Sequence, residues 1–168
     1  MIAKIKEIAQ NGDSIGGVIE LVIQNCTPGL GEPVFDKLEA KLGHALLSIG
    51  AVKGIEFGLG FKVANMLGSE CNDEFIVQNQ KIKSKQNLAG GILGGISTGE
   101  EIVIRLAIKP TPSIAKKQAT VSLNLEPQDL EITGRHDPCL CPRIVPVVEA
   151  MSAITLLDLL MINHSSNI

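Results

Sequence analysis

Gly134-Arg135-His136-Asp137-Pro138-Cys139 leads into the segment around which the rest of the chain is predicted to fold. It sets a cation, an imidazole and a carboxylate at three successive positions, and Pro138 disfavours helical geometry at Asp137. A long apolar pattern from Pro146 to Ile162 follows and predicts a helix buried between other layers, with Pro146 in its first turn. Polar groups at the mouth of such a helix often form a site. Spacing alone leaves open a capping turn in which Arg135 pairs with Asp137 on the surface.

The composition fits one globular domain, or a piece of one. The chain has 168 residues, of which 45% are hydrophobic, and its net charge is -3. A nucleic-acid partner is not expected, because there is no basic excess, no Trp and no Tyr. The apolar run Ile144 to Ile162 approaches membrane-spanning length, but Glu149 and Asp158 within it favour a buried helix without a membrane partner.

The four cysteines, Cys26, Cys71, Cys139 and Cys141, do not form the spacing of a disulfide framework. Without a signal peptide at the N-terminus, we expect a cytoplasmic location. His136 beside Cys139 and Cys141 lacks a fourth ligand at zinc-finger spacing, so no metal is expected.

Local patterns predict the other elements. Helical periodicity over residues 2–9 resembles the last turns of a helix that begins upstream, which indicates missing chain before residue 1. Lys81, Lys83 and Lys85 alternate, as on a solvated edge strand. The remaining predictions are strands at 18–23, 52–63, 101–108, 120–125 and 130–133, with 126–129 as a turn, and an amphipathic helix at Val34–Ile49 with Phe35 on its apolar stripe.

Two loops are rich in groups that bind anions. Ala89 to Gly99 holds five glycines, whose backbone amides can cradle a phosphate, although it lacks the P-loop ending. A glycine-rich crossing between packed elements gives the same pattern. The segment Lys109-Pro-Thr-Pro-Ser113 presents one cation and two hydroxyls, which suit a phosphate. A stiff connection between two elements is an equally good explanation of this segment.

Five ordered stretches together resemble the chorismate synthase family. They are Gly29-Leu-Gly-Glu-Pro-Val-Phe-Asp36, Ala51-Val-Lys-Gly54, Ala89-Gly-Gly-Ile-Leu-Gly-Gly-Ile-Ser97, Lys109-Pro-Thr111 and Gly134-Arg-His-Asp-Pro-Cys139. The stretch from Arg135 to Glu149 is similar to the family's C-terminal signature at each defined position. The resemblance covers the C-terminal half of the family's chain, and the histidine and Arg/Ser-rich motifs of the N-terminal half do not occur here.

The resemblance implies an α+β fold in which antiparallel sheets pack on long central helices as a β-α-β sandwich. Residues 1–168 would be a single partial domain that supplies about one half of it. The family converts 5-enolpyruvylshikimate 3-phosphate to chorismate by a 1,4-elimination of phosphate in the shikimate pathway of aromatic amino acid biosynthesis. It requires reduced flavin mononucleotide (FMN) and forms homotetramers.

Site roles follow from the same resemblance. Asp137 and Arg135 look like catalytic residues: Asp137 manages the proton at the flavin ring, and Arg135 contacts flavin and substrate anions. The family usually has a polar residue where Gly50 stands. The positions that look flavin-contacting are Gly50, Ala51, Gly94, Lys109, Pro110, Thr111, Pro112, Ser113 and Arg135.

Two principal hypotheses follow for function. In the first, the chain is part of a chorismate synthase and is inactive alone, because the imidazoles and arginines of the first half are absent. In the second, it is a non-enzymatic binding or oligomerisation module that keeps the fold. A weaker third hypothesis is a generic phosphate-binding domain that uses the glycine loop.

Overall fold

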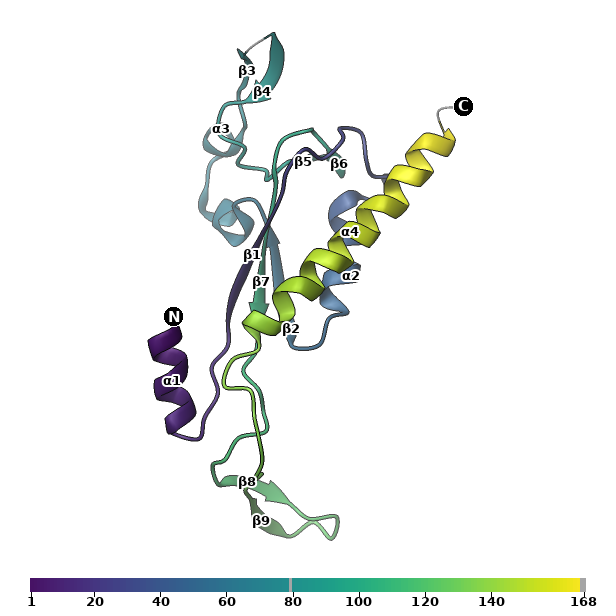
Figure 1. Ribbon diagram of the computed structural model, residues 1–168. Coiled ribbons are helices and arrows are strands. Elements are labelled where there is room, and N and C mark those ends of the chain that lie inside the picture. The colour runs from purple at the N-terminus through teal and green to yellow at the C-terminus, as the bar shows by residue number, and fades with distance from the viewer. Residues whose placement is uncertain (79, 167–168) are drawn as a thin grey trace.

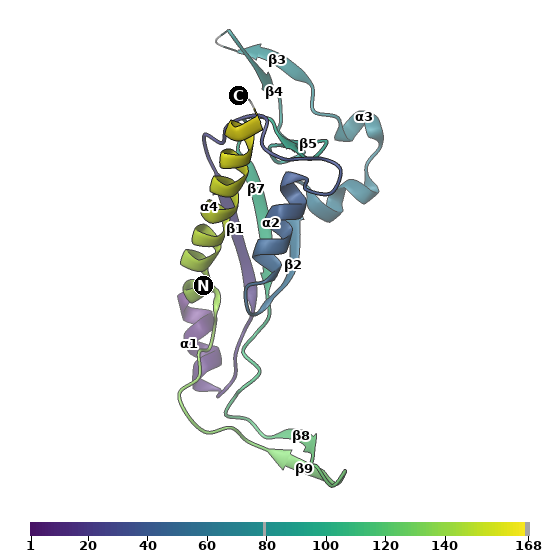
Figure 2. The same cartoon turned by 90° about the vertical axis from the view of Figure 1, so that its right-hand side faces the viewer.

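The computed structural model describes residues 1–78 and 80–166 and is elongated, with a central sheet, two covering helices and two projecting hairpins (Figure 1; Figure 2). The helices are α1 (Ile2–Gln10), α2 (Leu38–Leu47), the 3-10 helix η1 (Gly60–Asn65), α3 (Gly68–Cys71) and α4 (Cys141–Ser166). The strands are β1 (Gly17–Ile23), β2 (Val52–Phe57), β3 (Phe75–Gln78), β4 (Lys81–Ser84), β5 (Ile92–Leu93), β6 (Ile96–Ser97), β7 (Ile102–Ile108), β8 (Gln118–Val121) and β9 (Pro127–Leu130).

The central sheet has three antiparallel strands in the order β1-β7-β2. Strand β7 lies in the middle, with Leu106 opposite Ile19 of β1 and Ile55 of β2. Its residues alternate between a covered and an open face. The covered face carries the fully buried Ile102, Ile104 and Leu106.

Helices α2 and α4 cover this face of the sheet (Figure 2). Leu38, Leu42 and Leu46 of α2 are four residues apart, so they share one face of the helix, and all three are fully buried. From α4, Val148 and Leu159 enter the same core. The antiparallel sheet packed on helices agrees with the expected α+β class.

The helix predicted from Val34 begins later, at Leu38. Residues 32–36 form a loop instead, closed by two backbone hydrogen bonds between Glu32 and Asp36. Phe35, predicted on the apolar stripe, is 92% exposed. The amide of Leu38 donates to the carbonyl of Gly95, and this long-range contact helps set where the helix starts.

One predicted strand and one predicted turn also differ from the structure. The strand predicted at 52–63 ends at Phe57, because Gly58 takes a positive φ of 54° and leads into η1. The turn predicted at 126–129 is largely strand β9, and the reversal lies earlier, where Ser122 and Glu126 are joined by a backbone hydrogen bond. Leu125, with φ 65°, supplies the left-handed position in this reversal.

Helix α4 is longer than predicted and only partly covered. It starts at Cys141, so Pro146 lies in its second turn, where it removes a hydrogen bond to the carbonyl of Pro142. One side is buried, whereas the other side carries exposed apolar side chains at Ile154, Leu157 and Met161. The prediction of a helix buried on all sides is therefore wrong for these residues. By length and composition alone, α4 would be able to cross a membrane, as some core helices of soluble proteins also would.

Candidate functional site

Three sequence-predicted segments meet at one end of the central sheet. Val52 lies opposite Ile108 at the end of the antiparallel β2–β7 pair. Ala51, which precedes Val52, and Lys109, which follows Ile108, are therefore neighbours. The amide of Lys109 donates to the carbonyl of Ala51 at 2.9 Å. Thr111 Oγ1 donates to the main-chain oxygen of Asp137, also at 2.9 Å. The structure thus brings the Gly50–Ala51 turn, the loop 109–113 and the Asp137 segment together.

A fourth segment, the approach to β1, joins this junction. Ser14 Oγ donates to the carbonyl of Thr111 at 2.6 Å, and the amide of Ile15 donates to the carbonyl of Pro138 at 2.8 Å. Gly16 permits the close approach, because a Cβ there would collide with the carbonyl of Ile108. Sequence reasoning missed Ser14 because its partner is 97 residues away.

Asp137 forms its ion pair with Arg143 rather than with Arg135. Arg143 Nη2 lies 3.2 Å from Asp137 Oδ1, and the Asp137 side chain is 30% exposed. The surface pairing of Arg135 with Asp137 that spacing left open is therefore not formed. Arg143 stands in the first turn of α4, six positions after Asp137, and no local pattern predicted their contact.

Two cations near the junction have no ion-pair partner among the described residues, 1–78 and 80–166: Lys109 and Arg135. Both side chains are exposed. Arg135 also lines a cleft of about 280 Å³ together with Asp13, Gly134 and His136. His136 Nε2 lies 2.9 Å from the carbonyl of Ile132, which orients its ring. Free cations near the hydroxyl of Ser113 in the 109–113 loop form an arrangement suited to an anion, whereas the Thr111 hydroxyl donates to Asp137.

Gly94 lies apart from the other predicted positions. It forms the turn between β5 and β6 with Gly95, and both residues have positive φ. This hairpin touches the start of α2 through Leu38, whereas Gly50 follows the end of that helix, about 15 Å away by helix length. A Cβ on Gly95 would collide with Lys37, but nothing lies within 4 Å of a Cβ on Gly94. Packing therefore explains Gly95, whereas the positive φ of 60° in this turn explains Gly94.

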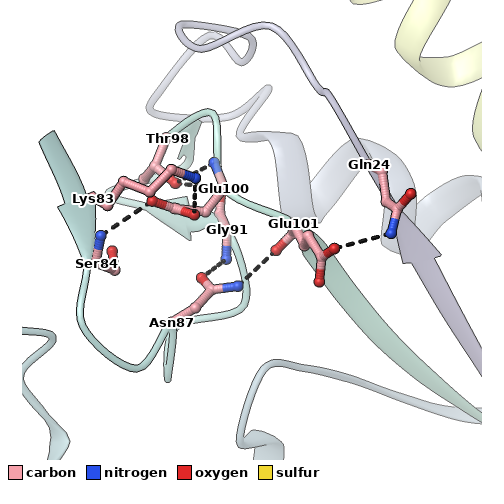
Figure 3. Close-up of polar contacts among 8 residues, drawn as sticks. All are labelled: Gln24, Lys83, Ser84, Asn87, Gly91, Thr98, Glu100 and Glu101. Carbon is pink, nitrogen blue, oxygen red and sulfur yellow. Dashed lines mark hydrogen bonds and ion pairs between the residues drawn. The ribbon is translucent and has the colours of Figure 1, made fainter. Parts of the chain in front are cut away.

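A second polar cluster ties the β3–β4 hairpin to the loop before β7 (Figure 3). Glu100 accepts hydrogen bonds from Lys83 Nζ at 3.3 Å and from the amide of Ser84 at 3.1 Å. Asn87 bridges Gly91 and Glu101, donating to the carbonyl of Glu101 at 2.9 Å and accepting from the amide of Gly91 at 2.8 Å. These groups bond to one another, so the cluster serves to anchor the hairpin.

Comparison with known proteins identifies the family. The family model described as chorismate synthase matches residues 1–161. The chain is 56% identical over 159 residues to the chorismate synthase of Methanosarcina barkeri, covering 94% of this chain and 44% of the relative. It is 58% identical over 154 residues to that of Methanocaldococcus jannaschii, covering 90% of this chain and 41% of the relative.

A solved structure agrees with the sequence matches. A crystal structure of chorismate synthase superposes with a TM-score of 0.77 at 32% identity, covering 96% of this chain and 42% of the other. The chain thus spans less than half the length of the relatives that it matches. By sequence and by fold, it belongs to the chorismate synthase family.

Proposed function

We propose that this chain supplies the C-terminal part of a chorismate synthase, which eliminates phosphate from 5-enolpyruvylshikimate 3-phosphate with reduced FMN bound. The observation that carries the proposal is the junction of the Ala51, Lys109–Ser113 and Asp137 segments, with the unpaired cations Lys109 and Arg135 beside it. Elimination of phosphate needs positive charge where the leaving group departs, and removal of a ring hydrogen needs a nearby base.

The side chains at the junction fit these requirements. Arg135 and Lys109 would hold the phosphate groups of substrate and flavin, and Ser113 offers a hydroxyl donor. Asp137 would accept or pass on the proton, held in place by Arg143 and by its backbone bond from Thr111. Reduced flavin, when bound, would supply electron transfer, and the flavin itself is not consumed in the overall reaction.

The isolated chain is expected to be inactive. The family's N-terminal motifs do not occur in these 168 residues. The exposed apolar side chains of α4 at Ile154, Leu157 and Met161 support the same proposal, since exposed apolar surface of this kind marks an interaction site. We propose that the missing part of the family's length covers this side and that the complete protein is a homotetramer.

A flavin titration tests the proposal. Purified chain is titrated with reduced FMN under anaerobic conditions, with and without 5-enolpyruvylshikimate 3-phosphate, and followed by absorbance. Binding that tightens with substrate is expected, and Arg135→Ala should weaken it roughly tenfold, the order of one charged hydrogen bond. Lys117→Ala is the matched control, because Lys117 pairs with Asp129 on the β8–β9 hairpin.

The outcomes separate the candidate functions. Absence of flavin binding by the chain alone would mean that these residues form only half of a site, whereas absence that persists when the N-terminal part of a relative is added would favour a non-enzymatic module. Phosphate-ligand binding that is insensitive to Asp137→Asn and Arg135→Ala would instead favour a generic phosphate site at the glycine loop. Robust turnover by the 168-residue chain would overturn the expected inactivity.

A further inference from the structure

Two thiols near Asp137 are not used by the proposed function. Cys139 and Cys141 are free, half-buried and separated by one residue. Cys141 packs against the start of β1, where its Sγ would lie 2.9 Å from a Cβ placed on Gly17. The other two cysteines, Cys26 and Cys71, lie in separate parts of the fold.

The two thiols flank Leu140, the residue at which the chain bends into α4. The carbonyl of Leu140 accepts hydrogen bonds from the amides of Arg143 and Ile144, so Leu140 is the residue from which α4 starts. A residue at this position is typically extended rather than helical, and an extended residue directs its two neighbours' side chains to one side. The thiols are close enough to interact: after burial, Cys139 is the next cause that raises the pKa of Cys141.

We propose that Cys139 and Cys141 form a reversible intramolecular disulfide when the protein meets a low-molecular-weight disulfide. The thiolate of one cysteine attacks the oxidant, giving a mixed disulfide and one released thiol. The other thiolate then attacks the protein sulfur of that mixed disulfide and releases the second thiol. The protein loses two protons and two electrons, and the small disulfide gains them as two thiols.

Ring closure pulls on the backbone that carries Asp137. Two extended residues span about 6.6–7.2 Å, and a relaxed disulfide accepts Cα separations of about 4.4–6.8 Å. The bond therefore draws Leu140 toward a tighter bend, and a strained disulfide of this kind is readily reduced. Asp137 and Pro138 adjoin the ring and bond to Thr111 and Ile15, so closure alters their positions. Any effect of closure on flavin binding rests on the proposed function, whereas the disulfide itself does not.

The test uses the whole chain with oxidised glutathione, followed by alkylation of remaining thiols and trypsin digestion. Cleavage after Arg135 and Arg143 releases peptide 136–143, which contains both thiols and neither of the other cysteines. We expect this peptide to be lighter by two hydrogens and unalkylated, and dithiothreitol to restore two alkylation sites. Cys139→Ser and Cys141→Ser should each instead carry one glutathione or one alkyl group, while Cys26→Ser, the control, keeps the closed peptide.

A peptide 136–143 that carries two glutathiones or two alkyl groups in the natively folded chain would overturn the proposal. So would cross-linked dimers in place of the closed peptide. Circular dichroism of each variant shows whether the fold is retained, and the wild-type result decides the proposal even where a variant does not fold. A separate flavin titration of the oxidised and reduced chains then measures the consequence for the site, so failure of flavin binding leaves the disulfide result intact.

Discussion

Thr111 and Asp137, 26 residues apart, are joined by a hydrogen bond from Thr111 Oγ1 to the main-chain oxygen of Asp137 at 2.9 Å. This bond uses the hydroxyl of one predicted flavin-contacting residue to fix the backbone of the predicted catalytic carboxylate. In turn, Ser14 Oγ donates to the carbonyl of Thr111. Side-chain hydroxyls thus hold the junction together with the backbone hydrogen bonds of Lys109 to Ala51 and of Ile15 to Pro138.

Replacement of Thr111 by Val is expected to loosen this junction. Valine keeps the shape but removes the donor, so the free energy of unfolding should fall by about 0.5–1.5 kcal/mol, the usual net value of such a bond. Urea unfolding of the two proteins measures the difference. Thr111→Ser keeps the hydroxyl and serves as the control. Unchanged stability of Thr111→Val together with a loss in Thr111→Ser would show that the methyl group of Thr111, rather than its hydroxyl, is what matters.

Truncation of the helix α2 core should be far more costly than truncation of the outer side of α4. Leu42 is fully buried, so Leu42→Ala should lower the free energy of unfolding by about 2–5 kcal/mol through lost transfer energy and a cavity. Leu157 is 57% exposed, so Leu157→Ala should change it by less than about 0.5 kcal/mol. Thermal or urea unfolding compares them. A large loss at Leu157 would mean that another chain already covers α4 in solution.

The sequence predicted the elements whose signal is local. Strand β7 and strand β1 follow their β-branched residues, and α1 follows its helical periodicity. The start of α2 was misplaced because Val34 and Phe35 fit an apolar stripe, while the actual start bonds to Gly95, more than fifty residues later. Such a contact leaves no local pattern.

The candidate site shows the same division. Resemblance to a family predicted the Lys109–Ser113 loop and Asp137, because their motifs are contiguous in the sequence. Only the structure shows that Ser14 and Arg143 belong to the site. Ser14 bonds to Thr111 on a distant segment, and Arg143 pairs with Asp137 across the bend before α4. The open side of α4 was also missed, because an evenly apolar helix does not reveal which of its sides is covered within this chain.

Replacing each of two glycines with alanine should change the free energy of unfolding in opposite directions. Gly43 lies inside α2, and a Cβ at this position would have nothing within 4 Å, so Gly43→Ala should stabilise the helix by up to about 1 kcal/mol. Gly31 has φ 124°, and a Cβ there would collide with the carbonyl of Gly95, so Gly31→Ala should destabilise by about 1–3 kcal/mol. Urea unfolding of each variant measures the change in the free energy of unfolding and its sign. Destabilisation by Gly43→Ala would indicate that the α2 surface is packed more closely in solution.

The ion pair between Asp13 and Lys116 predicts a pH-dependent contribution to stability. Lys116 Nζ lies 2.7 Å from Asp13 Oδ2, and this hydrogen bond, followed by one from the amide of Ser14, lowers the pKa of Asp13 below its ordinary 3.8. A carboxyl whose pKa is lower in the folded state stabilises the fold above its unfolded pKa and loses that contribution as pH falls through its folded pKa. Asp13→Asn should therefore be less stable than wild type at pH 7, and the gap should close as pH falls below 3.8.

The gap should be small, because both side chains reach solvent and exposed ion pairs contribute little. Urea unfolding at a series of pH values measures it, and Lys116→Met is the control that removes the main cause of the lowered pKa while leaving Asp13 in place. In the Lys116→Met background, Asp13→Asn should lower the free energy of unfolding at pH 7 by less than it does with Lys116 present. Salt at about 1 M should also reduce the stability difference between wild type and Asp13→Asn, because it screens the ion pair. A gap that persists unchanged at pH 2 would instead assign the effect to the hydrogen bond from Ser14, which the Asn oxygen fails to replace.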